Sequence, residues 1–476
     1  MCSSEKGVME IGLKRRVLVI GIDGADFDLI MPWVLQNYLP NLHKLISQGS
    51  SGLLRSTIQP TSAPAWVSFM TGVNQGKHGL YDFVSRRPQS YDLQITNASD
   101  VKFPTIFDII SQVGGRSIVI NLPYMVPPRP VNGIVVGGPF AASVTPDIVY
   151  PHTYFEVLQR IAPDYFILPD YDARSPDPMT DYAEKLNSLA SEDWDLFTVV
   201  FMATDEAHHA FWECMDAPSD SRLAQYRDVI REVYVRVDQA IGKILQQIAE
   251  DQDPRETIVI VMSDHGGGKL HWLINLNSWL AEAGYLTYKS SQVAVLKQLR
   301  TMIMKKSMYL YRRYISAGKR QTVREWLGPQ HFDQIKEGFE SVLLTSAVDW
   351  SRTQAYALGA GGNIYVNLKQ REPDGIVQPG VEYEQIRQEI IDALLELSDP
   401  ETGEQLVRCV HRCENLYQGP YASDAPDLIV QWMDYSNWGR GRYDSQGEIF
   451  EVRKHADFSQ RPLTGSHRLH GIFIAH

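Results

Sequence analysis

The stretch Val17-Leu-Val-Ile-Gly-Ile-Asp23-Gly24 is an apolar run that ends in a carboxylate. Two later stretches have the same form: Phe197-Thr-Val-Val-Phe-Met-Ala-Thr-Asp205 continues into Glu-Ala-His-His209, and Thr257-Ile-Val-Ile-Val-Met-Ser-Asp264 continues into His265-Gly266. We interpret each run as a buried strand of a parallel sheet whose polar residues follow its carboxyl end. Ligands bind at that edge of an open α/β sheet. The three stretches therefore predict one site.

Strands and helices alternate along the first part of the chain, from Val17 to about residue 285. Beyond the three strands above, the apolar pattern predicts strands at 52–58 and 117–121 and helices at 39–49, 104–113 and 222–250. Further strands are predicted at 355–359, 362–367, 427–432 and 471–475, with a helix over 384–397. This alternation predicts an α/β fold with a doubly wound, largely parallel central sheet and helices on both faces.

Charge and cysteine content restrict the partners and the compartment. The net charge of −12 argues against binding to a nucleic acid duplex. The four cysteines, Cys2, Cys214, Cys409 and Cys413, do not form a disulfide framework, which predicts a reducing, cytoplasmic location. Cys409 and Cys413 with His411 resemble a zinc knuckle, but no second cysteine pair follows. We expect no signal peptide, because the run from Val17 is short and ends in a carboxylate. No run reaches the roughly 20 apolar residues of a membrane span.

The residues after the second and third strands have the spacing of metal ligands. Asp205 and His209 lie four residues apart, so on a first helical turn both can bind one ion. The alternative is an ordinary helix start with a solvated Asp205. Asp264 and His265 are adjacent and can both reach an ion if the glycines after them allow a sharp turn. The alternative there is a glycine-rich turn with a surface histidine.

Two more candidate ligands lie near the chain ends. Asp23 follows an apolar run, where a charge is costly unless it is paired or bound to a metal. His467 lies in Gly465-Ser-His-Arg-Leu-His-Gly471. Carboxylates and imidazoles that converge on one sheet edge suit two divalent metals. This convergence indicates hydrolysis of an anionic ester.

Ser62 is the candidate nucleophile. The run Thr61-Ser62-Ala-Pro64 leads into a segment that is helical until Gly72, so Ser62 is predicted at a helix N-terminus, where free amides favour an anion. The simpler alternative is an N-cap serine. Thr61 is the rival nucleophile.

The order of these residues resembles the alkaline phosphatase superfamily, and specifically the type I phosphodiesterase/nucleotide pyrophosphatase family. The motifs that carry the resemblance are Gly21-Ile-Asp23-Gly24, Pro60-Thr-Ser62-Ala-Pro64 with Thr71-Gly72 and His78-Gly79, Asp205-x3-His209, Ser263-Asp264-His265-Gly266, and Gly465-x-His467. They span residues 17–471. The resemblance implies that Asp23, Asp264 and His265 hold one metal beside Ser62. It implies that Asp205, His209 and His467 hold the second.

The chain departs from the family pattern at two positions. The family nucleophile is commonly threonine, and the residue at that distance from Thr71-Gly72 is Ser62. The pyrophosphatase branch uses an asparagine some twenty residues further on to hold a phosphoryl oxygen, whereas this chain reads His78-Gly-Leu-Tyr-Asp-Phe83.

The resemblance implies a metal-dependent hydrolase of small anionic phosphoesters, phosphodiesters or nucleotide pyrophosphates, acting through a phosphoseryl intermediate. The mixed nitrogen and oxygen ligands favour two zinc ions, with manganese as the alternative. Competing interpretations are a phosphomonoesterase or phosphoglycerate mutase of the same superfamily, and a non-catalytic binding protein on this scaffold. A sulfatase would carry an arginine where Trp66 stands.

An insertion interrupts the predicted catalytic domain. We predict an alkaline phosphatase-like domain over residues 13–286 and 346–476, with a helical, cap-like insertion at 287–345. Within it, Lys297–Arg324 carries nine basic residues and no acid. That charge predicts contact with the anionic substrate or with an anionic membrane surface. The alternative is a solvated helix face that packs its apolar side on the sheet.

Overall fold

The structure, a computed structural model, describes residues 15–87, 89–138, 144–162, 192–216, 221–251, 253–289, 348–441, 448–451 and 463–476. Contacts divide the chain into two compact units. Unit 1 comprises Met1–Asn74, Asn97–Lys269 and Lys454–His476, and unit 2 comprises Gln75–Thr96 and Leu270–Arg453. The basic stretch Lys297–Arg324 lies outside the described residues, so the cap-like insertion and the domain boundaries around it stay predictions.

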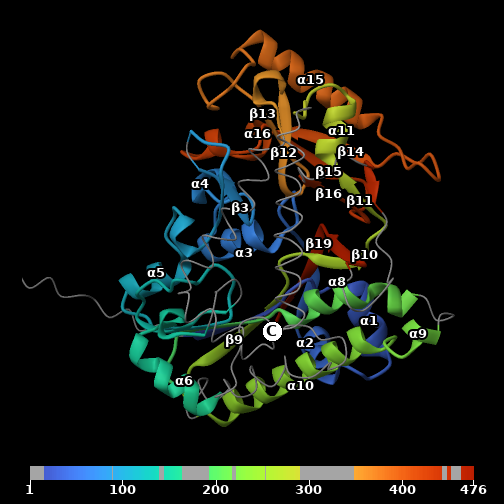
Figure 1. The fold of residues 1–476 in the computed structure, drawn as a ribbon. Coiled ribbons are helices and arrows are strands. Elements are labelled where there is room, and N and C mark those ends of the chain that lie inside the picture. The colour runs from blue at the N-terminus through green and yellow to red at the C-terminus, as the bar shows by residue number, and fades with distance from the viewer. Residues whose placement is uncertain are drawn as a thin grey trace, which may run out of the picture. The chain divides into compact units, whose positions relative to one another are not determined.

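Unit 1 is built on an eight-stranded sheet flanked by helices (Figure 1). Its strands in spatial order are β2 (Ser50–Arg55), β19 (His470–Ala475), β9 (Glu256–Met262), β1 (Arg15–Ile22), β8 (Leu196–Phe201), β5 (Ser117–Ile120), β6 (Gly133–Val136) and β7 (Val149–Tyr150). The pairs from β9 to β6 are parallel, while β2, β19 and β7 join antiparallel at the two edges. The predicted α/β fold with a largely parallel central sheet is confirmed.

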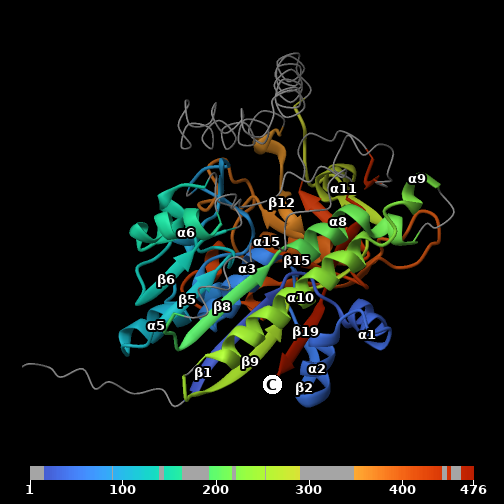
Figure 2. The same ribbon diagram turned by 90° about the horizontal axis from the view of Figure 1, so that it is seen from below.

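Helices flank this sheet, and most of them share one hydrophobic core with it; Figure 2 shows α10 lying along β9. They are α1 (Phe27–Leu35), α2 (Pro40–Gln48), α3 (Ser62–Thr71), α5 (Ile106–Gln112), α6 (Phe155–Ile161), α8 (Ala203–Asp216), α9 (Ser221–Ala224) and α10 (Val229–Glu250), with 3-10 turns η1 (Ala98–Asp100), η2 (Pro146–Ile148) and η3 (His152–Tyr154). The prediction of one continuous helix over 222–250 is wrong. Tight turns at Tyr226 and Arg227, which bond back to Leu223 and Ala224, separate α9 from α10.

Parallel pairing brings the carboxyl ends of the three central strands together. Ile22 of β1 pairs with Phe201 of β8, and Gly21 pairs with Met262 of β9. The residues that follow these strands therefore start at the same edge of the sheet. A two-stranded ribbon of β10 (Gly266–Lys269) and β18 (Gly465–Arg468) continues from β9 and brings the C-terminal segment to this edge.

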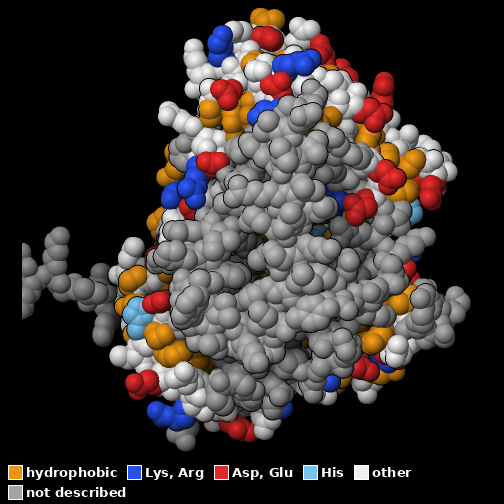
Figure 3. Space-filling model, viewed as in Figure 1, with side chains coloured by type: hydrophobic (Ala, Val, Ile, Leu, Met, Phe, Trp, Pro, Cys, Tyr) orange, Lys and Arg blue, Asp and Glu red, His pale blue; other side chains and the backbone are white. Residues whose placement is uncertain are grey.

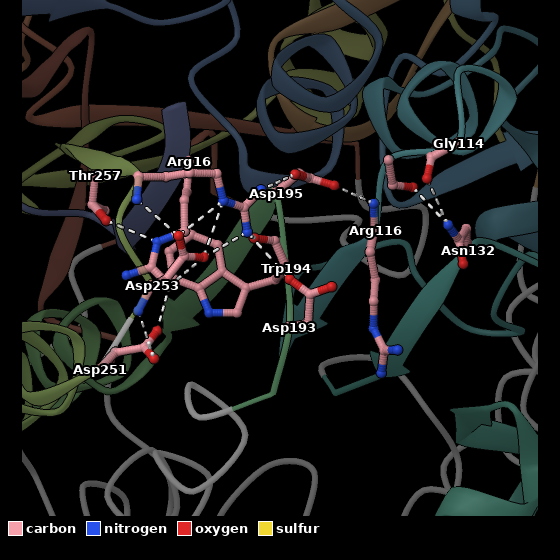
Figure 4. A network of polar contacts seen from close by, with 12 residues as sticks. Arg16, Gly114, Arg116, Asn132, Asp193, Trp194, Asp195, Asp251, Asp253 and Thr257 are labelled. Atoms are coloured by element: carbon pink, nitrogen blue, oxygen red, sulfur yellow. Dashed lines mark hydrogen bonds and ion pairs between the residues drawn. The ribbon is translucent and has the colours of Figure 1, made fainter. Parts of the chain in front are cut away.

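An ion-pair network joins the amino ends of the same strands, at the opposite edge (Figure 4). The Arg16 side chain is 3% exposed; it pairs with Asp251 and Asp253 and lies over the Trp194 ring at 4.5 Å. Arg255, just before β9, pairs with Asp253 at 2.7 Å, so Asp253 contacts both Arg255 and Arg16. These contacts connect the start of β1 with the residues before β9 and with Trp194, which precedes β8.

Unit 2 is built on a seven-stranded, mostly antiparallel sheet. Its strands in spatial order are β14 (Val407–Arg412), β15 (Leu428–Trp432), β13 (Asn363–Val366), β12 (Ala355–Gly361), β16 (Asn437–Gly441), β11 (Trp272–Asn275) and β17 (Phe450–Glu451). The unit also contains the hairpin β3 (Val84–Arg86) and β4 (Leu93–Ile95), the helices α4 (Gln75–His78), α11 (Leu276–Glu282), α15 (Val381–Leu395) and α16 (Cys413–Leu416), and the turns η5 (Trp350–Arg352) and η6 (Ala422–Asp424). The predicted strands at 355–359, 362–367 and 427–432 are confirmed as β12, β13 and β15. They belong to this second sheet.

Over the part of the chain that the structure describes, no helix combines the length and apolarity needed to span a bilayer. In the face shown in Figure 3, acidic and basic side chains of the described residues are interspersed with apolar ones.

Candidate metal-binding active site

Ser62 is the first residue of α3, as predicted from the sequence, and its side chain is buried in unit 1. Thr61 precedes it in an extended conformation as the N-cap, but its hydroxyl makes no capping bond. Pro64, at the third helical position, has no N–H to donate to that hydroxyl. Trp66 follows one helical turn after Ser62 and is also fully buried.

The first cluster surrounds the Ser62 hydroxyl. Ser62 Oγ lies 3.4 Å from Asp23 Oδ1 and 3.2 Å from His265 Nε2. His265 Nε2 lies 3.2 Å from Asp264 Oδ2 and 3.7 Å from Asp23 Oδ1. Asp264 Oδ1 accepts the backbone N–H of Gly24 at 3.2 Å, which fixes the carboxylate across the gap between β1 and β9. Asp23, Asp264 and His265 each present one atom within 4.8 Å of the others, so they can hold one ion.

The second cluster lies at the start of α8 and in β18. His209 Nε2 lies 3.2 Å from Asp205 Oδ2 and 3.0 Å from His467 Nε2, and His467 Nε2 lies 3.6 Å from Asp205 Oδ1. The rings of His265 and His467 stack with centroids 3.7 Å apart, so the clusters are contiguous. Asp205, His467 and His265 satisfy the same 4.8 Å criterion. His265 therefore faces both clusters, a position that the sequence does not reveal.

Backbone carbonyls orient all three histidines in the same way. The Nδ1 atoms of His265, His209 and His467 lie 3.0, 2.9 and 2.6 Å from the carbonyl oxygens of Gly266, Gly465 and Pro60. A carbonyl only accepts a hydrogen bond, so each Nδ1 carries a proton, and Nε2 is the ring atom that is directed at the site and can bind a metal ion. Such outer contacts are how proteins orient metal-binding histidines.

The charges of the first cluster also fit a cation. Burial, together with the neighbouring Asp264 and Asp205 carboxylates, raises the pKa of Asp23 well above its ordinary value. Burial likewise raises the pKa of Asp264, although His265 opposes this shift. Asp264 Oδ2 is buried without a hydrogen-bond donor, and the described residues contain no lysine or arginine ion pair to any of the three carboxylates. Uncompensated buried carboxylates beside imidazole lone pairs form a donor set that suits divalent ions.

The second cluster shows the same need for positive charge. Although burial opposes ionisation, His209 and His467 lower the pKa of Asp205 well below its ordinary value. Burial acts to lower the pKa of His209, but Asp205 outweighs it and the pKa is raised. Burial, and the neighbouring His265, lower the pKa of His467 well below its ordinary value. Two Nε2 atoms that face one carboxylate at this distance are stabilised by a proton or a metal ion between them.

Glycines allow the close approaches in unit 1. Gly24 has a φ of +69°, and a Cβ there would lie 3.0 Å from Asp205 Oδ1. Gly21 lies under the Trp66 ring, where a Cβ would come within 2.5 Å of Cη2. Sequence reasoning missed two residues that contact Asp23: Trp66, whose Nε1 donates to Oδ2 at 2.8 Å, and Thr204, whose hydroxyl donates to the backbone oxygen at 2.5 Å. The spacing Ser62-x3-Trp66, one helical turn, is the signal that could have identified Trp66.

Other histidines and cysteines of the chain have partners outside these ligand groups. The Nε2 atom of His208 lies 3.2 Å from the Tyr234 hydroxyl. His470 is exposed at the start of β19. In unit 2, Cys409 Sγ lies 3.3 Å from His411 Nε2, while Cys413 Sγ contacts Glu414. Among the described residues Cys409, His411 and Cys413 form no group of metal ligands, so the zinc knuckle is not supported.

Comparison with known proteins gives the family. The profile of the type I phosphodiesterase/nucleotide pyrophosphatase family matches residues 17–455. No curated protein matches the chain in sequence.

Solved structures share the fold. Phosphonoacetate hydrolase from Sinorhizobium meliloti 1021, in complex with phosphonoacetate, superposes with a TM-score of 0.56 at 13% identity, covering 97% of this chain and 90% of that one. The complex of the same enzyme with phosphonoformate superposes with a TM-score of 0.55 at 12% identity, again covering 97% of this chain and 90% of that one. Human ectonucleotide pyrophosphatase/phosphodiesterase 5 has a TM-score of 0.49 at 13% identity, covering 97% of this chain and 88% of that one. With its profile match over nearly the whole length, the chain belongs to the type I phosphodiesterase/nucleotide pyrophosphatase family and is a phosphoester hydrolase of that type.

Proposed function

We propose that this chain hydrolyses phosphodiesters with two divalent metal ions through a covalent phosphoseryl intermediate. The observation that carries the proposal is the position of Ser62 Oγ. It lies at the N-terminus of α3 and within 3.4 Å of both Asp23 and His265. A hydroxyl that contacts a cluster of metal ligands can be activated as a nucleophile.

The two clusters supply the metal sites. Asp23, Asp264 and His265 hold the ion beside Ser62, while Asp205, His209 and His467 hold the second. Mixed imidazole and carboxylate ligands favour zinc, with manganese as the alternative. When bound, the two ions supply positive charge that lowers the pKa of the Ser62 hydroxyl and offsets charge on the leaving oxygen.

Ser62 carries the covalent chemistry. Its oxygen attacks phosphorus in line, and the bond from phosphorus to the leaving alkoxide breaks as the serine–phosphorus bond forms. A water molecule then attacks the phosphoseryl group, which releases phosphate ester and restores the Ser62 hydroxyl. The N-terminus of α3 favours an anion at this position. The Oγ1 atom of Thr61, the rival nucleophile, is buried without a hydrogen-bond partner among the described residues.

The charge around Ser62 favours diesters over monoesters. A monoester carries an additional negative charge, for which selective monoesterases provide an extra cationic group. No arginine lies between Ser62 and Arg86 in the sequence, and Arg86 is paired with Glu372 in unit 2. Two metal ions alone balance a singly charged diester better than a doubly charged monoester.

The proposal is tested with bis-p-nitrophenyl phosphate and p-nitrophenyl phosphate, assayed at the same pH with zinc and with manganese. We expect a higher kcat/KM for the diester and a loss of several orders of magnitude in Ser62→Ala, with both metals retained. Thr61→Ala is the matched control and keeps most of the activity.

Each competing function has its own outcome. A higher kcat/KM for the monoester would indicate a phosphomonoesterase, and transfer of phosphate within a glycerate-type substrate would indicate a mutase. Metal binding without turnover of any ester would indicate a binding protein. Full activity in Ser62→Ala with an inactive Thr61→Ala would move the nucleophile to Thr61.

A further inference from the structure

The two oxygens of Asp23 have different partners. Oδ2 accepts the indole N–H of Trp66 at 2.8 Å. Oδ1 lies 3.4 Å from Ser62 Oγ and 3.7 Å from His265 Nε2. One oxygen is therefore held by the protein, and the other is presented to the nucleophile and to the first cluster.

The indole is held rigidly in this position. Trp66 is fully buried, and a buried indole N–H is usually hydrogen-bonded. The ring lies directly over Gly21 of β1, where a Cβ would come within 2.5 Å of Cη2. A side chain at position 21 would therefore displace the Trp66 ring from the Asp23 carboxylate.

Helix α3 links this contact to the nucleophile. Ser62 and Trp66 are four residues apart, so they lie on the same face of one helix with a fixed spacing. The helix thus carries both the hydroxyl that faces Oδ1 and the N–H that binds Oδ2. A rotation of the Asp23 carboxylate would break the indole hydrogen bond, so the position of Oδ1 is set relative to Ser62.

We propose that Trp66 is a positioning residue that holds Asp23 as a single-oxygen ligand, with Oδ1 directed at the metal and at Ser62. The inference rests on the proposed metal site. Trp66 touches no reacting atom in this role. It acts on metal affinity and on the nucleophile through Asp23, and the loss of such outer contacts typically weakens metal binding or activity by about 10- to 100-fold.

Trp66→Phe tests this role, because it removes the N–H and keeps an aromatic ring. Trp194→Phe is the matched control: Trp194 is also fully buried in unit 1 but packs on Phe197 and Arg16 at the opposite edge of the sheet. We expect the zinc dissociation constant of the site that contains Asp23 to rise about 10- to 100-fold in Trp66→Phe, as measured by competition with a chromophoric chelator. We expect kcat to fall with little change in KM. Trp194→Phe should match the wild type in both measurements.

A second substitution separates the hydrogen bond from the shape of the side chain. Benzothienylalanine introduced at position 66 replaces the indole N–H with sulfur and preserves both rings, so it should fold as the wild type does and weaken zinc as Trp66→Phe does. The role of Trp66 would be overturned if zinc affinity were unchanged in both position-66 variants. It would also be overturned if Trp194→Phe weakened zinc binding as much as Trp66→Phe does. If the wild-type chain bound no divalent ion, the proposed function itself would fail, and that outcome is distinct.

Discussion

His208 and His209 are adjacent on α8, yet their Nε2 atoms face different surroundings. His209 Nε2 lies between Asp205 and His467, whereas His208 Nε2 lies 3.2 Å from the Tyr234 hydroxyl. Successive residues of a helix point about 100° apart, so only one of the two can join Asp205 on the site face.

The same substitution at both positions should therefore give opposite results. We expect His209→Gln to lose one equivalent of metal and His208→Gln to retain two, as measured by elemental analysis of the purified variants. Catalytic turnover should fall with the lost metal in His209→Gln. Two equivalents in His209→Gln, with loss of metal in His208→Gln, would exchange the two assignments.

The position of Asp23 shows what a single residue type can predict. A carboxylate after an apolar run indicates a functional or paired charge because its burial is costly. The sequence could not indicate which atoms compensate it. Trp66 and Thr204 reach Asp23 from two different helices, and those contacts depend on how α3 and α8 pack on β1.

At the scale of elements, the amino ends of the central strands depend on buried charge pairs. Arg16 is 3% exposed on its side chain and paired with Asp251 and Asp253 (Figure 4). Its neighbour Arg15 pairs with Glu256 at 2.8 Å, but these two side chains are 61% and 69% exposed. Hydrogen bonds to buried charged groups are worth more than exposed ion pairs.

Arg16→Met should lower the free energy of unfolding by about 2 to 3 kcal/mol, because Asp251 loses its charged partner and Asp253 keeps only Arg255. Arg15→Met, the control, should change it by less than about 1 kcal/mol. Urea denaturation measures both. Since the network lies at the edge of the sheet opposite the clusters, kcat should be unchanged in both variants. A large loss of kcat in folded Arg16→Met would show coupling between the two edges.

Helix α4 of unit 2 ends in a buried histidine that should make the protein sensitive to acid. His78 Nδ1 accepts the backbone N–H of Leu80 at 3.2 Å, and burial lowers the pKa of His78 to about 4. An unfolded chain has a histidine pKa of about 6.5. As the pH falls below that value, the unfolded state takes up the proton first. The stability that neutral His78 contributes is therefore complete above pH 6.5 and is lost as the pH falls towards 4.

His78→Asn should remove this dependence, because an asparagine oxygen can accept the Leu80 N–H without titrating. Between pH 6.5 and 4, the wild type should lose up to about 3 kcal/mol relative to the variant. Urea unfolding at several pH values measures the difference, with the exposed His43→Asn as the control. A constant difference between wild type and His78→Asn over this range would contradict the prediction.

At the scale of the whole molecule, unit 1 concentrates uncompensated charge where three strands end. Asp23, Asp205 and Asp264 are all buried there. A ligand that binds the folded but not the unfolded chain stabilises the fold, by about 2.7 kcal/mol at a hundredfold excess over its dissociation constant. Removal of divalent ions should therefore destabilise the protein as well as inactivate it.

We expect a chelator to lower the melting temperature and zinc in excess of the chelator to restore it. Asp264→Asn provides the comparison, because a variant that lacks a ligand should respond less to both additions. Calorimetry with matched buffers measures the shift. Equal melting temperatures with and without chelator, in protein shown to contain metal beforehand, would argue against a contribution of the ions to folding.

The sequence by itself determined the central strands of the sheet in unit 1 and the edge at which their functional residues lie. Apolar runs of strand length that end in carboxylates can be recognised locally, because burial on both faces requires continuous hydrophobic residues. Parallel pairing then forces the carboxyl ends to one edge, so Asp23, Asp205 and Asp264 could be placed together before any coordinates. The family resemblance assigned His467, which lies far from them in the chain, to the second metal.

Only the tertiary structure decided the contacts between elements. The position of His265 between the two clusters, the hydrogen bond from Trp66 to Asp23, and the separate antiparallel sheet of unit 2 each depend on side chains or strands distant in sequence. The break between α9 and α10 likewise was not predicted from the sequence. Local patterns report which face of an element is buried, but the partner of that face is set by packing, which no single segment encodes.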